Sequence, residues 1–297
     1  MSRLLTAMPA AALAVAVLTG CGADPAPAAA PAATDKAPAS ADPQGKRRQM
    51  EAMRADCMKG KGFKYTANVP GPRKIPAEEL QARTGDYDAM RKDREKRGFG
   101  VFSGYVYSEP TIRQMFDGNP NTSILKALSE TQQKAWDTAD QTCYGAAFSK
   151  FTGKKVTSSM DALAQMSEKS KELRGRELDG DGELIKLAQA FGDCLKGKGH
   201  RVTSLKPTAI ARAGQDRFQA EVEKLGAEQH PGEKSPGFFP PELTPDQARP
   251  YLTREIKGAL EDLECGKDFY AVYQPKQWEV AEKVDAEFGV KEGLFGE

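Results

Sequence analysis

The 297-residue sequence has few of the residues that metal sites and nucleophilic enzymes need. It contains only two histidines, and none of its five cysteines forms a CxxC pair, which argues against a zinc site of the usual ligand spacing. The segment around Ser103 lacks the G-x-S-x-G spacing of a nucleophile elbow. His200 has no carboxylate or nucleophile beside it in the sequence pattern. We therefore expect no enzymatic activity, no cofactor and no metal site.

The sequence also lacks an excess of charge of either sign and a long apolar run. It has 43 Lys and Arg against 42 Asp and Glu, so a bulk attraction to nucleic acid is not expected. The apolar run at residues 4–18 is interrupted only by Thr6 and Pro9. It is too short to span a bilayer, which needs roughly 20 apolar residues.

Residues 1–20 have the features of a secretory signal peptide. Arg3 provides a positive start, and the apolar run that follows has the length of a signal-peptide core. The run ends in Leu-Thr-Gly-Cys at residues 18–21, which resembles the lipobox of bacterial lipoproteins. That resemblance implies cleavage before Cys21 and a diacylglyceryl group on its thiol, which would anchor the chain stably. The alternative is an ordinary signal peptide that happens to end in cysteine.

Residues 21–45 are rich in Ala and Pro and contain no other apolar side chain larger than alanine. Such a segment cannot bury enough apolar surface to offset its ordering entropy. We expect it to be a semi-extended tether.

A repeat is the most informative feature of the body. Residues 56–66, DCMKGKGFKYT, match residues 193–203, DCLKGKGHRVT, at seven of 11 positions. In each copy Gly62 or Gly199 is placed to end a helix in the left-handed conformation. The three residues after Phe63 or His200 are suited to short strands.

Four cysteines remain in the body, and an even number in an exported chain indicates disulfides. The pairs Cys57–Cys143 and Cys194–Cys265 keep each bridge within one copy of the repeat. Crossed pairing between the copies is the alternative. The second cysteine of each pair lies on an expected helix, and capping residues, Ser129 or Thr244, precede those helices.

These observations predict a mainly α fold, or an α+β fold with short strands, built from two tandem disulfide-pinned helical repeats. One charged helix is expected over residues 76–97, and a short strand or hairpin over residues 98–107. The expected division of the chain is a signal peptide (1–20), a lipidated tether (21–45), a first helical repeat (46–155), a linking helix (156–180) and a second helical repeat (181–297).

Two aromatic-rich loops supply candidate contact residues for a partner: Phe238 and Phe239 in one, Tyr105 and Tyr107 in the other. The acidic stretch at 177–183 resembles a calcium loop only in part, because Ala188 stands where a bidentate carboxylate is needed. The Lys-Gly-Lys-Gly segments could cradle an anion, but the C-terminus of a helix has the wrong dipole sign for that role.

The lipobox, the Ala/Pro tether and the Cys-Met/Leu-Lys-Gly-x-Gly-aromatic repeat together resemble secreted lipoproteins of actinobacteria, although His200 departs from the aromatic position. The resemblance implies lipid anchoring at the outer face of the cell membrane. Our first hypothesis is a non-enzymatic surface lipoprotein that binds a protein or an envelope component. The alternatives are an accessory or solute-binding lipoprotein of a transporter and an envelope hydrolase. A flat aromatic patch would favour the first, a groove between the halves with convergent polar groups the second, and a deep pocket lined by two or more carboxylates the third.

Overall fold

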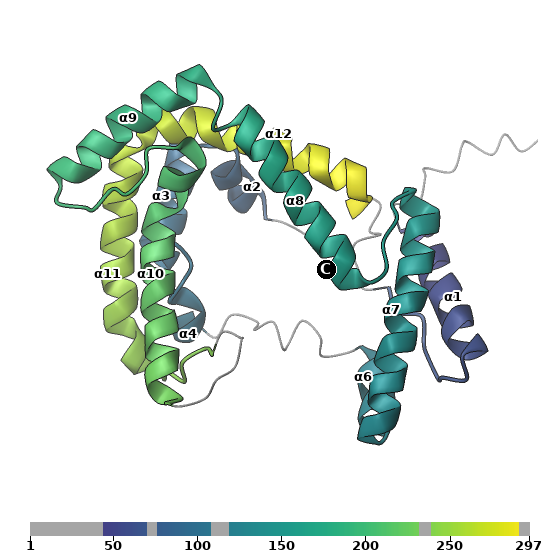
Figure 1. Ribbon diagram of the computed structural model, residues 1–297. Coiled ribbons are helices and arrows are strands. Elements are labelled where there is room, and N and C mark those ends of the chain that lie inside the picture. The colour runs from purple at the N-terminus through teal and green to yellow at the C-terminus, as the bar shows by residue number, and fades with distance from the viewer. Residues whose placement is uncertain (1–43, 70–75, 108–118, 232–238, 291–297) are drawn as a thin grey trace, which may run out of the picture. The chain divides into compact units, whose positions relative to one another are not determined.

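The computed structural model describes residues 44–69, 76–107, 119–231 and 239–290, and the regular secondary structure in these ranges is entirely helical (Figure 1). The mainly α prediction is therefore confirmed. All described helices belong to one unit, Ala41–Glu297. The helices are α1 (Gly45–Gly60), α2 (Ala77–Arg83), α3 (Tyr87–Arg97), α4 (Ser103–Tyr107), α6 (Pro120–Lys126), α7 (Glu130–Thr152), α8 (Ser159–Glu177), α9 (Gly182–Gly197), α10 (Pro207–Gln229), α11 (Pro245–Cys265) and α12 (Lys267–Phe288).

The capping box expected at Ser129 is formed, and the capping residue expected at Thr244 is part of a capping box as well. Ser129 accepts a hydrogen bond from the Gln132 backbone N–H at the start of α7, and the Gln132 side chain accepts one from the Ser129 N–H. Thr244 and Gln247 make the same reciprocal pair at the start of α11. Each box satisfies two backbone groups that a helix start leaves without intrahelical partners, which fixes where these long helices begin.

The two copies of the repeat end their helices in the same way. In α1, the Gly62 N–H donates to the Lys59 carbonyl at 2.9 Å and the Phe63 N–H to the Met58 carbonyl at 3.0 Å. The corresponding bonds after α9 are both 2.9 Å. Gly62 has φ 85° and its counterpart Gly199 has φ 84°, so both copies are Schellman caps that require a glycine at this position.

Alanine at Gly62 or Gly199 is expected to lower the free energy of unfolding by about 1 kcal/mol, because only the positive φ is unfavourable there. A Cβ atom at either position would meet no atom within 4 Å. Gly60 and Gly197 also have open space within 4 Å but lie within the helices, so alanine there is expected to be neutral or stabilising. Urea denaturation of the four single variants tests this; equal effects at all four positions would contradict it.

Both expected disulfides are present. Cys57–Cys143 joins α1 to the middle of α7 with a Cα–Cα distance of 5.6 Å. Cys194–Cys265 joins α9 to the end of α11 with a Cα–Cα distance of 5.5 Å. Both distances lie in the ordinary range for disulfides, and crossed pairing between the copies is excluded.

The helices pack so that segments distant in the sequence contact each other. Helix α1 packs against α7, whereas α3 and α4 pack against α11, and α2 and α8 pack against α12. The main core is aromatic, with Phe148, Phe191, Phe269, Tyr270 and Phe288 all at most 2% exposed. Residues 77–107 thus lie in the first predicted repeat by sequence but contact helices of the second.

The strand expected over residues 98–107 is wrong. This segment forms a turn followed by the short helix α4. The carboxylate of Glu255, on α11, accepts hydrogen bonds from the backbone N–H groups of Phe99, Val101 and Phe102 at 2.7–2.8 Å. These donors are therefore bound to a side chain and cannot form a ladder with another strand.

The other local expectations need smaller corrections. The short strands expected after the two repeat copies are not formed; at Thr66, for example, the backbone N–H and C=O bond the side chain of Asn121. The single helix expected over residues 76–97 is two helices, α2 and α3. The second begins anew because Asp86 accepts from the Ala89 N–H and caps α3.

Candidate functional site

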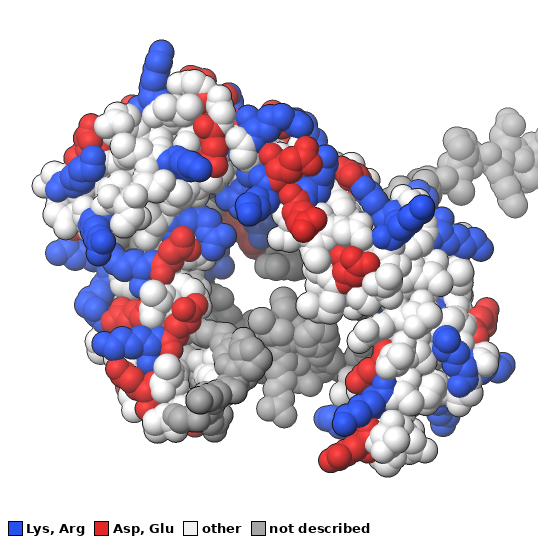
Figure 2. Space-filling view, viewed as in Figure 1, with Lys and Arg blue, Asp and Glu red and all other residues white. Residues whose placement is uncertain are grey.

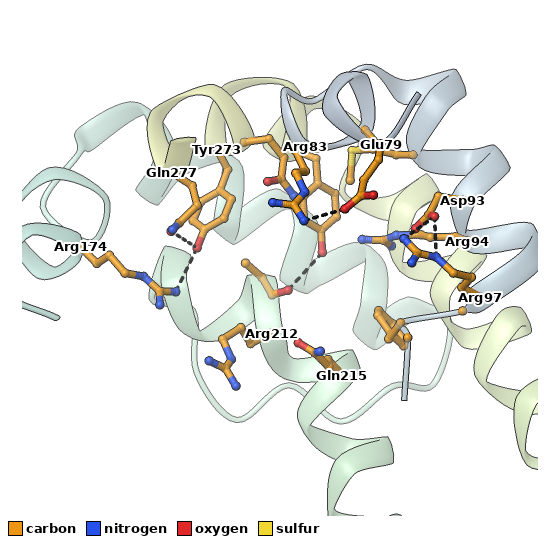
Figure 3. A pocket seen from close by; sticks show the side chains of 18 residues that line it. Glu79, Arg83, Asp93, Arg94, Arg97, Arg174, Arg212, Gln215, Tyr273 and Gln277 are labelled. Carbon is orange, nitrogen blue, oxygen red and sulfur yellow. Dashed lines mark hydrogen bonds and ion pairs between the residues drawn. The ribbon is translucent and has the colours of Figure 1, made fainter. Parts of the chain in front are cut away.

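A cavity of about 730 Å³ lies among α2, α3, α8, α10 and α12 (Figure 3). This volume is in the range of small-molecule sites, about 300–1,000 Å³. The lining is dominated by arginine, glutamine and tyrosine side chains. It consists of Glu79, Ala82, Arg83, Met90, Asp93, Arg94, Arg97, Gly98, Phe99, Gly100, Arg174, Ala211, Arg212, Gln215, Tyr270, Tyr273, Gln274 and Gln277.

The charge in this cavity is strongly positive for a protein of nearly zero net charge. Five arginines line it against two carboxylates, Glu79 and Asp93, whereas the whole chain has a formal net charge of +1. Guanidinium groups stay protonated at every physiological pH. The excess of positive charge therefore persists at any pH that the folded protein meets.

Two of the arginines are neutralised within their own helices. Arg83 bonds Glu79 at 2.6 Å and Arg97 bonds Asp93 at 2.6 Å, each pair spaced by one helical turn. Both carboxylates of the cavity are thus engaged by arginine. They do not form a pair of acids facing one another, as an acid–base hydrolase would require.

A third arginine is part of the wall. Arg94 is 8% exposed and binds the Asp262 carboxylate at 2.6 Å and the Ala259 carbonyl at 2.7 Å. Its guanidinium also lies over the Tyr270 ring, 4.8 Å from the centroid. Burial raises the pKa of Asp262, and the positive charge of Arg94 opposes that rise. This network ties α3 to α11 and holds one side of the cavity rigid.

Arg174 and Arg212 lie together on the other side of the cavity (Figure 3). The Arg174 Nε is buried without a hydrogen-bond partner among the described residues, and its Nη2 reaches only the neutral Tyr273 hydroxyl at 3.4 Å. Arg212 is 56% exposed and forms an ion pair at 3.2 Å with Asp216, one helical turn further along α10. A buried guanidinium N–H without an acceptor is costly, so an anion at this point would satisfy it.

A second cavity, of about 450 Å³, contains His200. The imidazole Nε2 lies 2.8 Å from Glu261, and Nδ1 lies 3.2 Å from Arg217. The ring is half-buried and bonded on both nitrogens. This arrangement positions α10 against α11, and no nucleophilic side chain is bonded to the imidazole.

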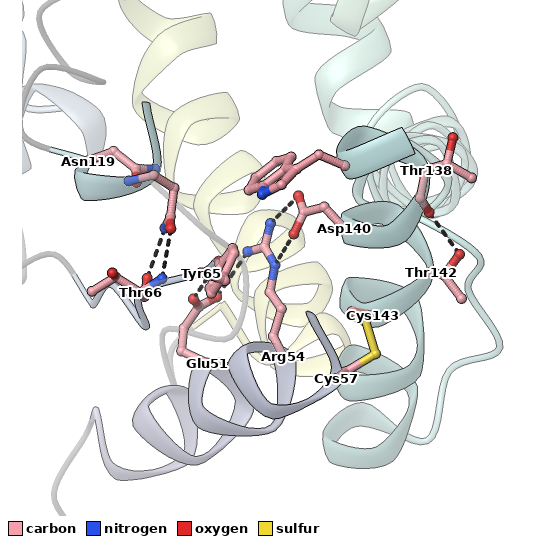
Figure 4. Close-up of polar contacts among 12 residues, drawn as sticks. Glu51, Arg54, Cys57, Tyr65, Thr66, Asn119, Thr138, Asp140, Thr142 and Cys143 are labelled. Carbon is pink, nitrogen blue, oxygen red and sulfur yellow. Dashed lines mark hydrogen bonds and ion pairs between the residues drawn. A yellow bond between two sulfur atoms is a disulfide. The ribbon is translucent and has the colours of Figure 1, made fainter. Parts of the chain in front are cut away.

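A third polar cluster lies between α1 and α7 (Figure 4). Arg54 bonds Asp140 with two hydrogen bonds of 2.8 and 2.6 Å and also bonds Glu51 at 3.0 Å. The Tyr65 hydroxyl donates to Glu51 at 2.9 Å, and burial raises the pKa of Tyr65. Burial also raises the pKa of Tyr144 to about 12. The cluster is satisfied internally and braces α1 beside its disulfide.

The predicted contact residues do not gather into one aromatic patch among the described residues. Phe239 is half-buried, with its ring 5.1 Å from that of His230. Tyr105 is also half-buried, 6.2 Å from the Phe102 ring. Tyr107 is 43% exposed and has the Lys96 ammonium 5.6 Å from its ring centroid. Whether any of them contacts a partner stays a prediction.

Cys21 and Phe238 lie outside the described residues. None of the helices that the structure describes combines the length and apolar composition needed to cross a bilayer. Within the same ranges, no group of three or more His, Cys, Asp or Glu side chains could hold a metal ion. Two disulfides are typical of an extracytoplasmic protein.

The two halves share a second pattern, Asp-x-x-Cys, which was not among the features expected from the sequence. Asp140 precedes Cys143 by three residues, and Asp262 precedes Cys265 by the same spacing. Each aspartate binds an arginine from another helix, Arg54 on α1 or Arg94 on α3. Alignment of the second cysteines, in addition to the first ones, would have revealed the shared aspartates but not their arginine partners.

Comparison with protein-family models, curated proteins and solved structures found no match to this chain.

Proposed function

We propose that this chain is an exported, lipid-anchored, non-enzymatic binding protein whose arginine-lined cavity receives an anionic ligand. The observation that supports binding is the pair of Arg174 and Arg212 at one side of a cavity of about 730 Å³, with the buried Arg174 Nε lacking an acceptor among the described residues. Arginine is well suited to carboxylate and phosphate groups, because its planar fork of donors matches their geometry.

The cavity favours a small anionic ligand over the protein partner of our first hypothesis. Its walls come from α2 and α3 on one side and from α8, α10 and α12 on the other, which is the groove with convergent polar groups expected of a solute-binding lipoprotein. The predicted aromatic contacts at Phe239 and Tyr105 pack against neighbouring rings instead. The engaged carboxylates Glu79 and Asp93 argue against a hydrolase.

Labelled palmitate is expected to be incorporated at Cys21 in intact cells, and a Cys21→Ala variant is expected to remain unlabelled. The basis is the Leu-Thr-Gly-Cys sequence, in which the thiol is the acceptor of the lipid. Membrane fractionation followed by mass spectrometry of the N-terminal peptide measures the result. An unlabelled wild-type chain that begins elsewhere than Cys21 would refute the anchor and leave the binding proposal standing.

The binding proposal is tested with the mature chain carrying Cys21→Ser, so that no lipid is attached. Citrate and inorganic pyrophosphate, at ionic strength matched with sodium chloride, are expected to raise its Tm, because an anion bound at about 100 times its Kd adds roughly 2.7 kcal/mol to the free energy of unfolding. The Arg174→Gln/Arg212→Gln variant is expected to lose this rise.

The matched control is Arg176→Gln, since Arg176 also lies on α8, is 61% exposed and pairs with Glu172 and Glu177. It should respond to both anions as the wild type does. An equal loss of the Tm rise in the control and in the double variant would show general charge binding and would contradict a site at Arg174.

A further inference from the structure

A second hollow adjoins the arginine-lined cavity and shares Arg174 and Arg212 with it. Its volume is about 670 Å³, and its walls come from α8, α12 and the start of α10. Because the same two arginines line both spaces, they stand at the junction. A ligand held by them can therefore extend into either space.

The wall of this second space includes an apolar side formed by two helices. Leu163 and Met166 on α8 face Ala281 and Val284 on α12. Leu163 is 46% exposed, and Met160, three residues earlier on the same helix, is 69% exposed. Large apolar side chains that stay exposed beside a hollow are typical of a surface used for binding.

The charged side chains around this apolar wall are mainly basic. Lys171, Arg174, Lys206 and Arg212 line the space, against Asp179 and Asp285. Figure 2 shows basic and acidic side chains side by side over the C-terminal half of α8. Both oxygens of Asp179 accept hydrogen bonds, from the backbone N–H and the hydroxyl of Thr208, at 2.8 and 2.9 Å. The positive groups thus lie at one end of an apolar wall.

We infer that the ligand is a single-chain anionic amphiphile, whose carboxylate or phosphate lies at Arg174 and Arg212 and whose acyl chain lies along Leu163, Met166 and Val284. This inference rests on the proposed function and names the ligand class of the same site. Charge complementarity selects the anionic headgroup, and the apolar wall selects the chain. A free short anion would leave the apolar wall in water.

The test measures Kd by isothermal titration calorimetry with the Cys21→Ser chain, below the critical micelle concentration of each probe. Dodecanoate and dodecyl phosphate are expected to bind roughly 250-fold more tightly than the eight-carbon octanoate and octyl phosphate, since they have four more methylenes and each buried methylene strengthens binding about fourfold. Dodecyltrimethylammonium, which has the same chain and the opposite charge, is expected not to bind.

Two variants that introduce glutamate test where the acyl chain of the ligand lies. Leu163→Glu is expected to weaken dodecanoate binding at least tenfold. Ile185→Glu is the matched control, because Ile185 is also 46% exposed but lines neither space. It is expected to bind dodecanoate as the wild type does.

The outcomes separate the two proposals. Equal affinity for the eight- and twelve-carbon probes, or equal weakening by both glutamate variants, would overturn the amphiphile and leave the anionic site intact. Absence of binding by every anionic probe, short or long, would overturn the proposed function as well. Binding to phospholipid vesicles with no affinity for the monomeric probes would indicate a membrane surface and would also overturn the inference.

Discussion

Replacement of both Cys194 and Cys265 by alanine is expected to lower the free energy of unfolding by about 4 kcal/mol. The bridge closes a loop of 71 residues, and the chain-entropy model assigns roughly 4–5 kcal/mol to loops of this size. It also fixes the end of α9 against the end of α11, directly beside the aromatic core around Phe191 and Tyr270. Guanidinium denaturation of the Cys21→Ser chain with and without this double substitution measures the loss.

The matched control is the Cys57→Ala/Cys143→Ala variant. Its loop of 86 residues is nearly the same length, so the chain-entropy model expects a similar loss. The two bridges differ in their surroundings, because α1 is held to α7 by the bonds of Arg54 to Asp140 as well. A loss below about 1 kcal/mol in the Cys194/Cys265 variant would show that the bridge is not a main source of stability.

The helix boundaries at Ser129 and Thr244, and the glycine caps after Cys57 and Cys194, could be predicted because their causes are local. A capping side chain meets a backbone group three residues away, and a cap glycine is chosen by its own φ. The disulfide pairing followed from the repeat, which is also visible in the sequence. These features required no knowledge of which helices meet.

The segment at residues 98–107 could not be predicted in the same way, because its conformation depends on a residue about 150 positions later. Val101, Tyr105 and Tyr107 have the composition of a strand, but the Glu255 carboxylate binds the backbone N–H groups of the turn. A distant side chain thus overrode local propensity. No pattern within the segment indicates it.

The arginine-lined cavity could not be predicted from the sequence for a related reason. Arg174 and Arg212 lie on α8 and α10, 38 positions apart, and no motif connects them. One signal was available: Arg174 continues the same face of α8 as Leu163, Met166 and Ser170, at spacings of three, four and four residues. A charged residue that continues a face begun by two large apolar residues is a candidate for a buried site, and only the packing of α8 on α12 shows what it faces.

Substitution of Glu255 by alanine is expected to destabilise the fold by about 4 kcal/mol. The side chain is fully buried, at 0% exposure, and its two oxygens accept from three backbone N–H groups at 2.7–2.8 Å. Alanine would leave three backbone N–H donors without an acceptor, and each buried donor without a partner costs about 1–3 kcal/mol. Water that enters the site would accept some of these hydrogen bonds and reduce the total cost. The turn that carries Phe99 would also lose its attachment to α11.

Comparison with Glu255→Gln separates the role of shape from the role of the carboxylate. Burial raises the pKa of Glu255, whereas the hydrogen bonds from the backbone N–H groups oppose that rise. Glutamine keeps the shape and one acceptor oxygen but turns an amide toward a backbone donor, so a loss of roughly half that of alanine is expected. Thermal and urea denaturation give both values, with hydrogen exchange at Phe99, Val101 and Phe102 as the local measurement. Two results would contradict this role of the carboxylate: equal destabilisation by alanine and glutamine, or unchanged exchange at these amides in the alanine variant. In either case the Glu255 carboxylate would not be the reason why residues 98–107 form a turn and a helix rather than a strand.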